Sequence, residues 1–352
     1  MRYKTFGRRA GLRVSELALG AANFGTRWGH GAAREDAKKV FDAYVEAGGN
    51  FIDTADGYQF GESEELVGEF IAADRDRFVV STKYTLGTTA TDGISRTGNS
   101  RKNMIRSLEG SLKRLKTDRI DLYWAHFADG MTPMEEIIRA FDDLMRAGKI
   151  HYAGLSNFPA WRIARADLLA EIRGWGPIVG IQIEYSLAQR TAERELLPMA
   201  EALGLGAALW SPLAGGFLTG KYRISDEGRT KSFLARLVHT EKTARETAIL
   251  DALLAIAKEV DYSATQVALA WLLHKAARST TALIPILGAR TYEQLAGTLG
   301  ALEGNLSEEQ IKRLDETSQI GLGTPHEQIH GSAAAIVGGK PELLEPRVIP
   351  VA

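Results

Sequence analysis

Eight short apolar runs, each followed by a longer segment of helical periodicity, constrain the fold of this chain more than any other feature. Most runs are nearly continuous in apolar residues, which is typical of parallel strands covered by helices. They occupy residues 17–20, 50–54, 78–83, 120–126, 152–156, 178–184, 206–211 and 283–287. We therefore predict eight buried strands.

The segments between these runs carry apolar residues on one helical face. In the first of them the positions i, i+3, i+4 and i+7 hold Ala37, Val40, Phe41 and Tyr44. Start signals agree: Thr132 before Pro133 predicts a cap and a first-turn proline, and Ser263 with Gln266 has capping-box spacing. The pattern predicts helices between consecutive strands.

Strand–helix alternation of this kind predicts parallel strands joined by right-handed crossovers. An open doubly wound sheet and a closed barrel both fit, but eight units favour closure. Residues 20–25 lack the Gly-x-Gly-x-x-Gly fingerprint that an open dinucleotide-binding sheet carries after its first strand. We predict an α/β fold, a (β/α)8 TIM barrel.

Three segments lie outside the repeat. Residues 2–14 predict a hairpin that plugs one barrel mouth, and residues 212–242 predict a long loop after strand 7, followed by an extra helix near 243–260. We expect a single barrel domain over residues 1–320 and a C-terminal tail over 321–352.

Composition excludes several classes of protein. The chain has no cysteine, so disulfides, thiolate nucleophiles and zinc–thiolate sites are ruled out. Its formal net charge of −1, with both signs interspersed, argues against a nucleic-acid partner. No apolar stretch reaches the roughly 18 residues of a membrane span, and the first residues do not form a signal peptide. We expect a cytoplasmic protein that needs no metal.

Polar residues follow three consecutive strands. Asp53 comes at the end of the second, with Tyr58 five residues on, Lys83 ends the third and His126 ends the fourth. The carboxyl ends of barrel strands form one rim, where barrel enzymes place their chemistry. We therefore expect these four side chains to lie together.

The four residue types fit carbonyl reduction. A phenol with an ordinary pKa of about 10 is a poor acid near neutrality. A nearby lysine favours the phenolate and a carboxylate keeps that lysine charged, while a histidine can orient a carbonyl oxygen. Taken singly, each residue also fits a structural role: Asp53 as a turn residue, Lys83 and Tyr58 as surface residues, and His126 as a core histidine.

Longer motifs carry a family resemblance. Residues 51–64 (FIDTADGYQFGESE) resemble the aldo-keto reductase signature, and residues 81–83, 121–126, 154–158, 182–186, 210–213 and 220–221 match further blocks in order. The chain is most similar to the bacterial branch that also resembles potassium-channel β subunits. The resemblance implies an NADPH-dependent oxidoreductase that reduces an aldehyde or ketone to an alcohol. Tyr58 would donate the proton, Asp53 and Lys83 would tune it, and His126 would orient the substrate.

The same resemblance implies a cofactor site for NADPH (NADP+). Around the nicotinamide and pyrophosphate it implies Ser156, Asn157, Gln182, Trp210, Ser211, Pro212, Leu213, Gly215 and Lys221. At the 2′-phosphate and adenine end it implies Gly288, Arg290 and Gln294, although Gln294 also has capping-box spacing from Thr291. Where the family commonly has an acidic residue and Asn, this chain has Gly297 and Thr298, which weakens the expected adenine contacts.

Loops above the same rim would form the substrate pocket. The expected residues are largely aromatic: Asn23, Phe24, Trp28, Tyr84 and Phe127. They favour a fairly large, partly apolar carbonyl compound. Residues 85–99 fit either a mobile flap over this pocket or an ordinary surface loop.

Two other functions stay open at this point. One is a nucleotide-sensing regulatory subunit of the channel-β type with little turnover. The other is a barrel aldolase that uses Lys83 as a Schiff base. The sequence specifies neither the physiological substrate and direction of reaction nor the oligomeric state.

Overall fold

Eight parallel strands close into a barrel in the computed structural model, which describes residues 1–89, 91–223, 240–345 and 348. The barrel strands are β3 (Ala18–Gly20), β4 (Phe51–Asp53), β5 (Val79–Tyr84), β6 (Ile120–Ala125), β7 (Ile150–Ser156), β8 (Ile178–Glu184), β9 (Gly206–Trp210) and β10 (Leu283–Leu287). They are paired in chain order, and β10 closes the ring by pairing with β3. The predicted (β/α)8 barrel is confirmed.

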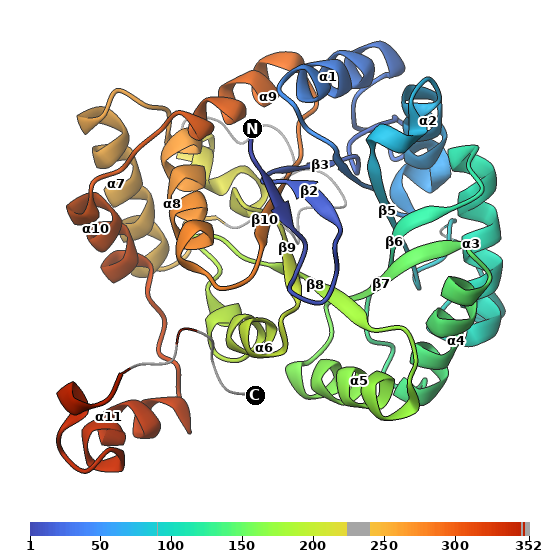
Figure 1. Ribbon diagram of the computed structural model, residues 1–352. Coiled ribbons are helices and arrows are strands. Elements are labelled where there is room, and N and C mark those ends of the chain that lie inside the picture. Colours follow the sequence, from blue (N-terminus) through green and yellow to red (C-terminus); the bar gives the residue numbers. More distant parts are fainter. Residues whose placement is uncertain (90, 224–239, 346–347, 349–352) are drawn as a thin grey trace.

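Helices form an outer ring around these strands (Figure 1). Their bounds are α1 (Arg34–Glu46), α2 (Glu62–Ile71), α3 (Arg101–Leu115), α4 (Met134–Arg146), α5 (Ala160–Arg173), α6 (Leu196–Leu203), α7 (Ala244–Glu259), α8 (Ala264–Arg278), α9 (Tyr292–Leu299) and α10 (Glu308–Ser318). A last helix, α11 (His326–Ile336), lies outside the ring. The predicted helix after the long loop is α7, and the predicted Ser263–Gln266 capping box opens α8. Residues 224–239 of that loop lie outside the described residues.

One predicted helix start is wrong. Pro133, not Thr132, occupies the N-cap of α4. The hydroxyl of Thr132 instead donates to the carboxylate of Asp129 at 2.6 Å, and the same carboxylate accepts the backbone N–H groups of Met131 and Thr132. This local turn competes with capping for the threonine side chain.

The strands sort their side chains between two apolar layers by position. On β6, Leu122 and Trp124 point into the barrel, whereas Tyr123 and Ala125 pack with the surrounding helices. On β5, Val79 points inward and Val80 outward. This alternation decides which residues of a strand end can reach the centre of the rim.

The N-terminal hairpin closes one mouth of the barrel, the one opposite the rim that the carboxyl ends of the strands form. Strands β1 (Tyr3–Thr5) and β2 (Arg13–Ser15) pair antiparallel, and Phe6 follows β1 into the barrel interior. The Phe6 ring lies 5.7 Å from that of Phe51 and 6.2 Å from that of Trp124, centroid to centroid. The predicted plug is confirmed.

The C-terminal residues lie apart from the helical ring. Helix α11 projects beyond α6 and has no buried residue (Figure 1). The division of the chain at residue 320 stays a prediction.

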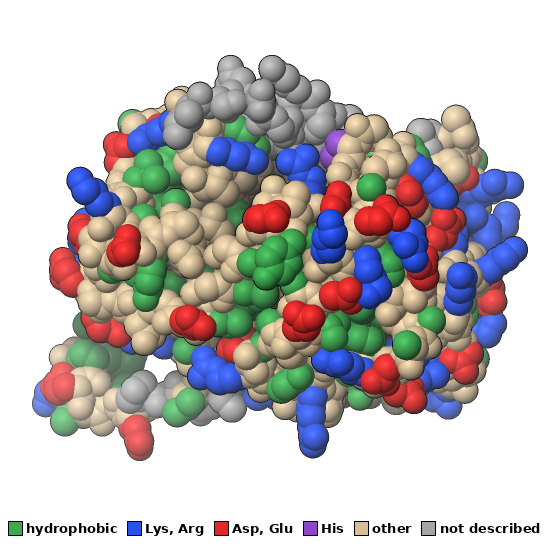
Figure 2. Space-filling model, turned by 90° about the horizontal axis from the view of Figure 1, so that it is seen from above, with side chains coloured by type: hydrophobic (Ala, Val, Ile, Leu, Met, Phe, Trp, Pro, Cys, Tyr) green, Lys and Arg blue, Asp and Glu red, His purple; other side chains and the backbone are tan. Residues whose placement is uncertain are grey.

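The face shown in Figure 2 has acidic and basic side chains interspersed, with neither sign gathered into one region. Among the described residues, no helix is long and apolar enough to cross a membrane.

Candidate active site

The three predicted strand ends meet at the C-terminal rim of the barrel. Asp53 ends β4 and is paired in register with Ser81 of β5, while Lys83 is paired with Trp124 of β6, two residues before His126. Lys83 continues the inward series that begins at Val79, so its side chain points to the barrel axis. The rim thus brings together side chains from three different strand ends.

Lys83 is the centre of a buried polar cluster. Its Nζ lies 2.5 Å from Oδ2 of Asp53, donates to the carbonyl oxygen of Thr54 at 2.8 Å, and donates to the hydroxyl of Tyr58 at 3.2 Å. The Lys83 side chain has no exposed surface, and that of Asp53 is 4% exposed. A charge this deeply buried requires a paired partner, which Asp53 supplies.

Two further residues hold Asp53 in place. The hydroxyl of Ser81 donates to its Oδ1 at 2.7 Å, and Nε2 of Gln182 donates to the same oxygen at 2.9 Å. Both carboxylate oxygens of Asp53 are therefore occupied. Gln182, predicted as a nicotinamide contact, uses its amide nitrogen to orient this carboxylate.

The ionisation of the cluster follows from burial and charge. Burial lowers the pKa of Lys83, but the Asp53 carboxylate and the Tyr58 hydroxyl raise it, and the net direction is upward. Burial raises the pKa of Tyr58, and Lys83 opposes this rise without cancelling it. Lys83 thus acts on Tyr58 in the predicted direction, but the expected net lowering of the Tyr58 pKa is wrong because burial dominates.

His126 completes the group of four. Its ring lies 5.9 Å from that of Tyr58 in an edge-to-face arrangement. Burial, with a smaller contribution from Lys83, lowers the pKa of His126 well below its ordinary value. The imidazole is therefore neutral near pH 7 and retains one N–H that can donate a hydrogen bond.

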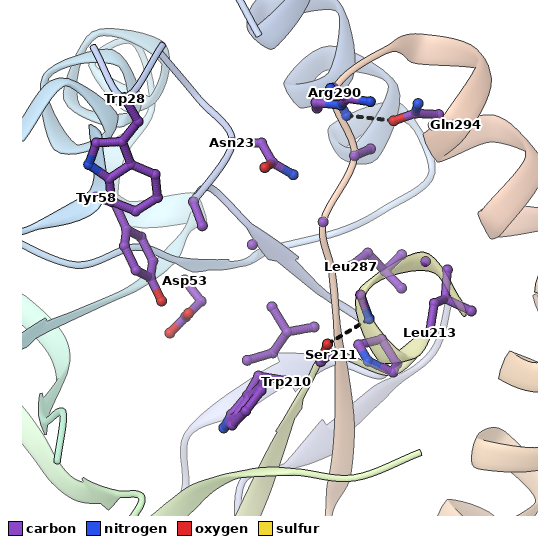
Figure 3. A pocket seen from close by; sticks show the side chains of 18 of the residues that line it. Asn23, Trp28, Asp53, Tyr58, Trp210, Ser211, Leu213, Leu287, Arg290 and Gln294 are labelled. Atoms are coloured by element: carbon purple, nitrogen blue, oxygen red, sulfur yellow. Dashed lines mark hydrogen bonds between the residues drawn. The ribbon is translucent and has the colours of Figure 1, made fainter. Parts of the chain in front are cut away.

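A cleft of about 1110 Å³ begins at this group and continues along the rim to Arg290 (Figure 3). Seventeen of the predicted site residues line it: Asn23, Trp28, Asp53, Tyr58, His126, Phe127, Asn157, Gln182, Trp210, Ser211, Pro212, Leu213, Gly215, Lys221, Gly288, Arg290 and Gln294. A ligand pocket for one small molecule has roughly 300–1,000 Å³. This cleft therefore has room for an elongated ligand.

A family model described as the aldo/keto reductase family matches residues 16–319. The chain belongs to the aldo/keto reductase family. It is 38% identical to YrpG, an uncharacterised oxidoreductase of Bacillus subtilis, over 90% of this chain and 95% of the relative. It is 37% identical to a norsolorinic acid reductase of Aspergillus flavus, over 90% and 81% of the two chains. It is 35% identical to an aryl-alcohol dehydrogenase (NADP+) of Phanerodontia chrysosporium, over 92% and 88%.

Membership of the aldo/keto reductase family makes this chain an oxidoreductase. The expected family is confirmed, and the closer likeness to channel β subunits stays a prediction. The residues beyond 319 lie outside the match.

Three non-glycine residues in or directly beside the middle of the cleft have an unusual backbone conformation. Asn157, Ser211 and Ala214 all have left-handed φ angles, of 56°, 54° and 50°. Nδ2 of Asn157 donates to the carbonyl oxygen of His126, and its Oδ1 accepts from the indole Nε1 of Trp210; both distances are 3.0 Å. These contacts connect the Trp210 ring to the end of the cleft that holds Tyr58.

The turn after β9 is closed by a hydrogen bond between two of its own residues. The hydroxyl of Ser211 accepts the backbone N–H of Gly215 at 3.0 Å (Figure 3). Gly215 and Gly216 have φ angles of 66° and 98°, which glycine adopts without a steric penalty. The turn therefore brings backbone without side chains to the wall of the cleft.

The far end of the cleft carries the cation Arg290. The guanidinium of Arg290 has no hydrogen bond or ion pair with any residue that the structure describes. Its backbone N–H donates to Oε1 of Gln294 at 2.9 Å, while Thr291 caps α9 by accepting the N–H of Gln294. The capping interpretation of Gln294 thus holds only in part, because its side chain reaches Arg290 rather than Thr291. A Cβ added at Gly297 would meet open space.

Four predicted residues do not line the cleft. Lys83 and Ser156 are fully buried behind it, and Ser156 accepts a hydrogen bond from Asn157. Two substrate-pocket predictions are wrong. Tyr84 follows the inward-pointing Lys83 and therefore points outward, where its ring packs on Tyr123 and Phe141. Phe24 is buried against Phe70 of α2.

The cleft also contains residues that the sequence did not single out. Its lining includes Arg27, Phe60, Leu86, Thr88, Thr219, Ser263, Thr265 and Glu293. Leu86 and Thr88 belong to the segment expected as a flap, whose ends are joined by hydrogen bonds from Thr85 to Asn99 and from Gly98 to Thr85. Phe60 lies in the motif at residues 51–64, so the sequence offered a signal for it as well as for Leu86 and Thr88, whereas Ser263 was noted only as a helix cap and Thr265 not at all.

A second buried acid, Asp56, lies beside the turn that carries Tyr58. Neither of its carboxylate oxygens has a hydrogen-bond partner among the described residues. Burial, reinforced by the nearby Glu64 carboxylate and opposed by Arg114 and Arg106, raises the pKa of Asp56 to about 7. An ionised Asp56 is therefore a destabilising feature of this region.

Proposed function

We propose that this aldo/keto reductase uses NADPH to reduce an aldehyde or ketone to an alcohol, with Tyr58 as the proton donor. The observation that carries the proposal is the 3.2 Å contact between Lys83 and the Tyr58 hydroxyl, in a buried cluster neutralised by Asp53.

The residues divide the work of proton transfer. Tyr58, whose pKa is raised by burial, keeps its proton near neutrality until negative charge develops on the substrate oxygen. Lys83 then stabilises the phenolate as it forms. His126, neutral because burial lowers its pKa, would donate a hydrogen bond to the same oxygen. Bound NADPH would supply the hydride to the carbonyl carbon.

The far half of the cleft fits NADPH. Arg290 offers a guanidinium that no described residue neutralises, as the 2′-phosphate requires. Ser211 and Gly215 form a turn suited to the pyrophosphate, and the indole of Trp210, oriented by Asn157, offers a flat surface. Gln182 and Asn157 would contact the carboxamide, with Ser156 directly behind them.

The near half of the cleft fits an aromatic carbonyl compound. Trp28, Phe60 and Phe127 line it around Tyr58, and flat apolar walls favour flat apolar ligands. The relatives include a protein named aryl-alcohol dehydrogenase and proteins named norsolorinic acid reductase. We therefore propose aryl aldehydes or aryl ketones as the substrate class, in exchange with the corresponding alcohols.

The proposal is tested by following NADPH absorbance at 340 nm with a panel of aryl and alkyl carbonyl compounds. Tyr58→Phe should lower kcat by about 10²- to 10⁴-fold, because general acid catalysis contributes that much. Its affinity for NADPH, measured by fluorescence titration, should stay near that of the wild-type protein. Full turnover by this variant would refute the role of Tyr58.

The cofactor preference rests on Arg290. Arg290→Ala should weaken the binding of NADPH by about 10- to 100-fold, since a charge-assisted hydrogen bond contributes roughly 1.5–3 kcal/mol. The affinity for NADH should stay nearly unchanged. An equal loss for both dinucleotides would contradict a phosphate contact.

Two further outcomes would favour the other two functions. Tight NADPH binding without turnover of any carbonyl compound would favour a nucleotide-sensing subunit. Covalent labelling of Lys83 by borohydride in the presence of a carbonyl substrate would favour an aldolase.

A further inference from the structure

The backbone directly after Tyr58 is held in an unfavourable conformation. Gln59 and Phe60 have φ angles of 50° and 54°, and Gly61 continues in the left-handed region at 91°. Side chains other than glycine adopt this region rarely, because Cβ approaches the carbonyl oxygen. Two consecutive examples persist only where the surroundings over-determine them, which is common at functional sites.

The side chain of Gln59 explains what holds this turn. It is fully buried and bonds the loop between β3 and α1 at three points. Its Nε2 donates to the carbonyl oxygens of Ala22 and His30 at 3.3 and 3.0 Å. Its Oε1 accepts the backbone N–H of Trp28 at 2.8 Å. One amide thus clamps both ends of the loop and the residue near its tip.

Trp28 is the residue that this clamp places over the Tyr58 phenol. Its ring lies 6.0 Å from that of Tyr58 and 6.3 Å from that of Phe60, in both cases edge to face. Figure 3 shows the indole beside the phenol. The ring therefore bounds the space that the flat part of a substrate would occupy.

A second anchor holds the same loop from outside the cleft. Oε2 of Glu62 accepts the backbone N–H groups of Thr26 and Arg27 at 2.8 and 3.0 Å. The amide of Trp28, in contrast, donates to Gln59. Glu62 therefore offers a matched control for general loosening of the loop.

We propose that Gln59 is a positioning residue for substrate specificity, holding Trp28 against Tyr58 so that the cleft selects planar aromatic carbonyl compounds. This inference rests on the proposed reductase function for its physiological meaning. Gln59 touches neither the reacting atoms nor the cluster of Lys83, so it acts through the loop that carries Trp28. The left-handed turn is the consequence of directing an amide away from the cleft while Tyr58 faces it.

The test uses Gln59→Gly, which suits the left-handed backbone and removes only the clamp. We expect the Michaelis constant for an aromatic substrate, naphthalene-2-carbaldehyde, to rise about tenfold relative to that for propanal, the effect of losing one aromatic contact. The change should appear in the Michaelis constant rather than in kcat, because the proton donor is not altered. Glu62→Ala, which removes the anchor at Thr26 and Arg27 but leaves Gln59 in place, should leave the ratio of the two Michaelis constants within about twofold.

Binding supplies a measurement that does not depend on turnover. The fluorescent alcohol naphthalen-2-ylmethanol should bind the wild-type protein and bind Gln59→Gly about tenfold more weakly, and Trp28→Ala should behave alike. The double variant should show no further loss, because the two residues act through one contact. Equal binding by wild type and variant, or no binding by the wild type, would overturn the inference.

The two hypotheses fail separately. Binding that depends on Gln59, without oxidation of NADPH, would refute the reductase and keep the positioning role. Turnover with an unchanged ratio of Michaelis constants would keep the reductase and refute the positioning role. If Gln59→Gly does not fold, as judged by circular dichroism, Trp28→Ala decides: unchanged binding of the naphthyl alcohol refutes the role.

Discussion

The two mouths of the barrel are built from the same strands but on opposite principles. The N-terminal mouth is closed by the hairpin, and Phe6 fills it with apolar surface against Phe51 and Trp124. The C-terminal mouth is open and contains a buried ammonium group, two buried carboxylates and the neutral His126. One end is specialised for stability and the other for chemistry.

Backbone strain follows the same division. Eight described non-glycine residues have positive φ angles, and six of them lie at the open mouth: Gln59, Phe60, Thr85, Asn157, Ser211 and Ala214. The other two end helices or follow them, at Lys116 and Asp261. Unfavourable conformations are thus concentrated in the loops of the open mouth, which is common at functional sites.

The largest effect is expected at the open mouth, from Lys83→Met. Turnover should fall by about 10³-fold or more, because Tyr58 loses the charge that stabilises its phenolate, an effect of roughly the size of general acid catalysis. The free energy of unfolding should also fall by about 3–5 kcal/mol, since Asp53 becomes a buried unpaired charge. Adding Asp53→Asn should restore stability, measured by urea denaturation, without restoring activity. Recovery of activity would show that the charge of Lys83 is not needed for turnover.

At the closed mouth, Phe6→Ala should lower the free energy of unfolding by about 3–5 kcal/mol, as buried aromatic deletions do. Steady-state kcat/KM at 25 °C should not change, because the site lies at the other end of the barrel. Tyr3→Phe, which loses a single exposed hydrogen bond to Gly48, serves as the control. Loss of activity with stability retained would show that the two mouths are coupled.

The buried carboxyl group of Asp56 at the open mouth should make the stability of the protein depend on pH. The pKa of Asp56 is raised to about 7 in the folded protein, whereas its unfolded value is near 4. The contribution of Asp56 to the free energy of unfolding is therefore highest below about pH 4, and it falls as the pH rises from 4 through 7. Asp56→Asn should therefore stabilise the protein at pH 8, by an amount on the order of 2–4 kcal/mol, and this gain should shrink towards pH 4. Thermal unfolding across pH measures it, with the exposed Asp74→Asn as control. A gain that does not depend on pH would contradict the assignment.

The smallest effect is expected from Gly180→Ala at the closed mouth. An added Cβ would lie 2.4 Å from Cε1 of Phe6, and overpacking of this kind costs about 1–3 kcal/mol. Gly11→Ala, whose Cβ would meet nothing within 4 Å, should be nearly neutral. Equal stability of both variants in urea would show that Phe6 does not fit its socket tightly.

Much of this architecture was predictable from local patterns. The eight strands follow from apolar runs, and the helices from apolar residues that recur at helical spacing. The juxtaposition of Asp53, Lys83 and His126 follows from one topological fact, since the carboxyl ends of parallel strands share a rim. The outward direction of Tyr84 was also open to prediction, because the residue after an inward-pointing lysine must point outward.

Other predictions failed, for two different reasons. Thr132 was expected to cap α4, but a second local pattern competes for its hydroxyl, which donates to the carboxylate of Asp129 three residues earlier. The pKa of Tyr58 was expected to fall beside Lys83, but burial, which depends on every neighbour, raises it.

The sequence by itself decides the hydrophobic periodicity and the number of strands, because these depend on near neighbours, and it decides the sign of the charge on each side chain, which depends on residue type. Only the folded barrel decides how far each charge lies from water and which distant groups meet, as Gln182 meets Asp53 across 129 residues. Desolvation and long-range contact are sums over the whole packed molecule, so the chemistry of the rim, unlike its composition, exists only after folding.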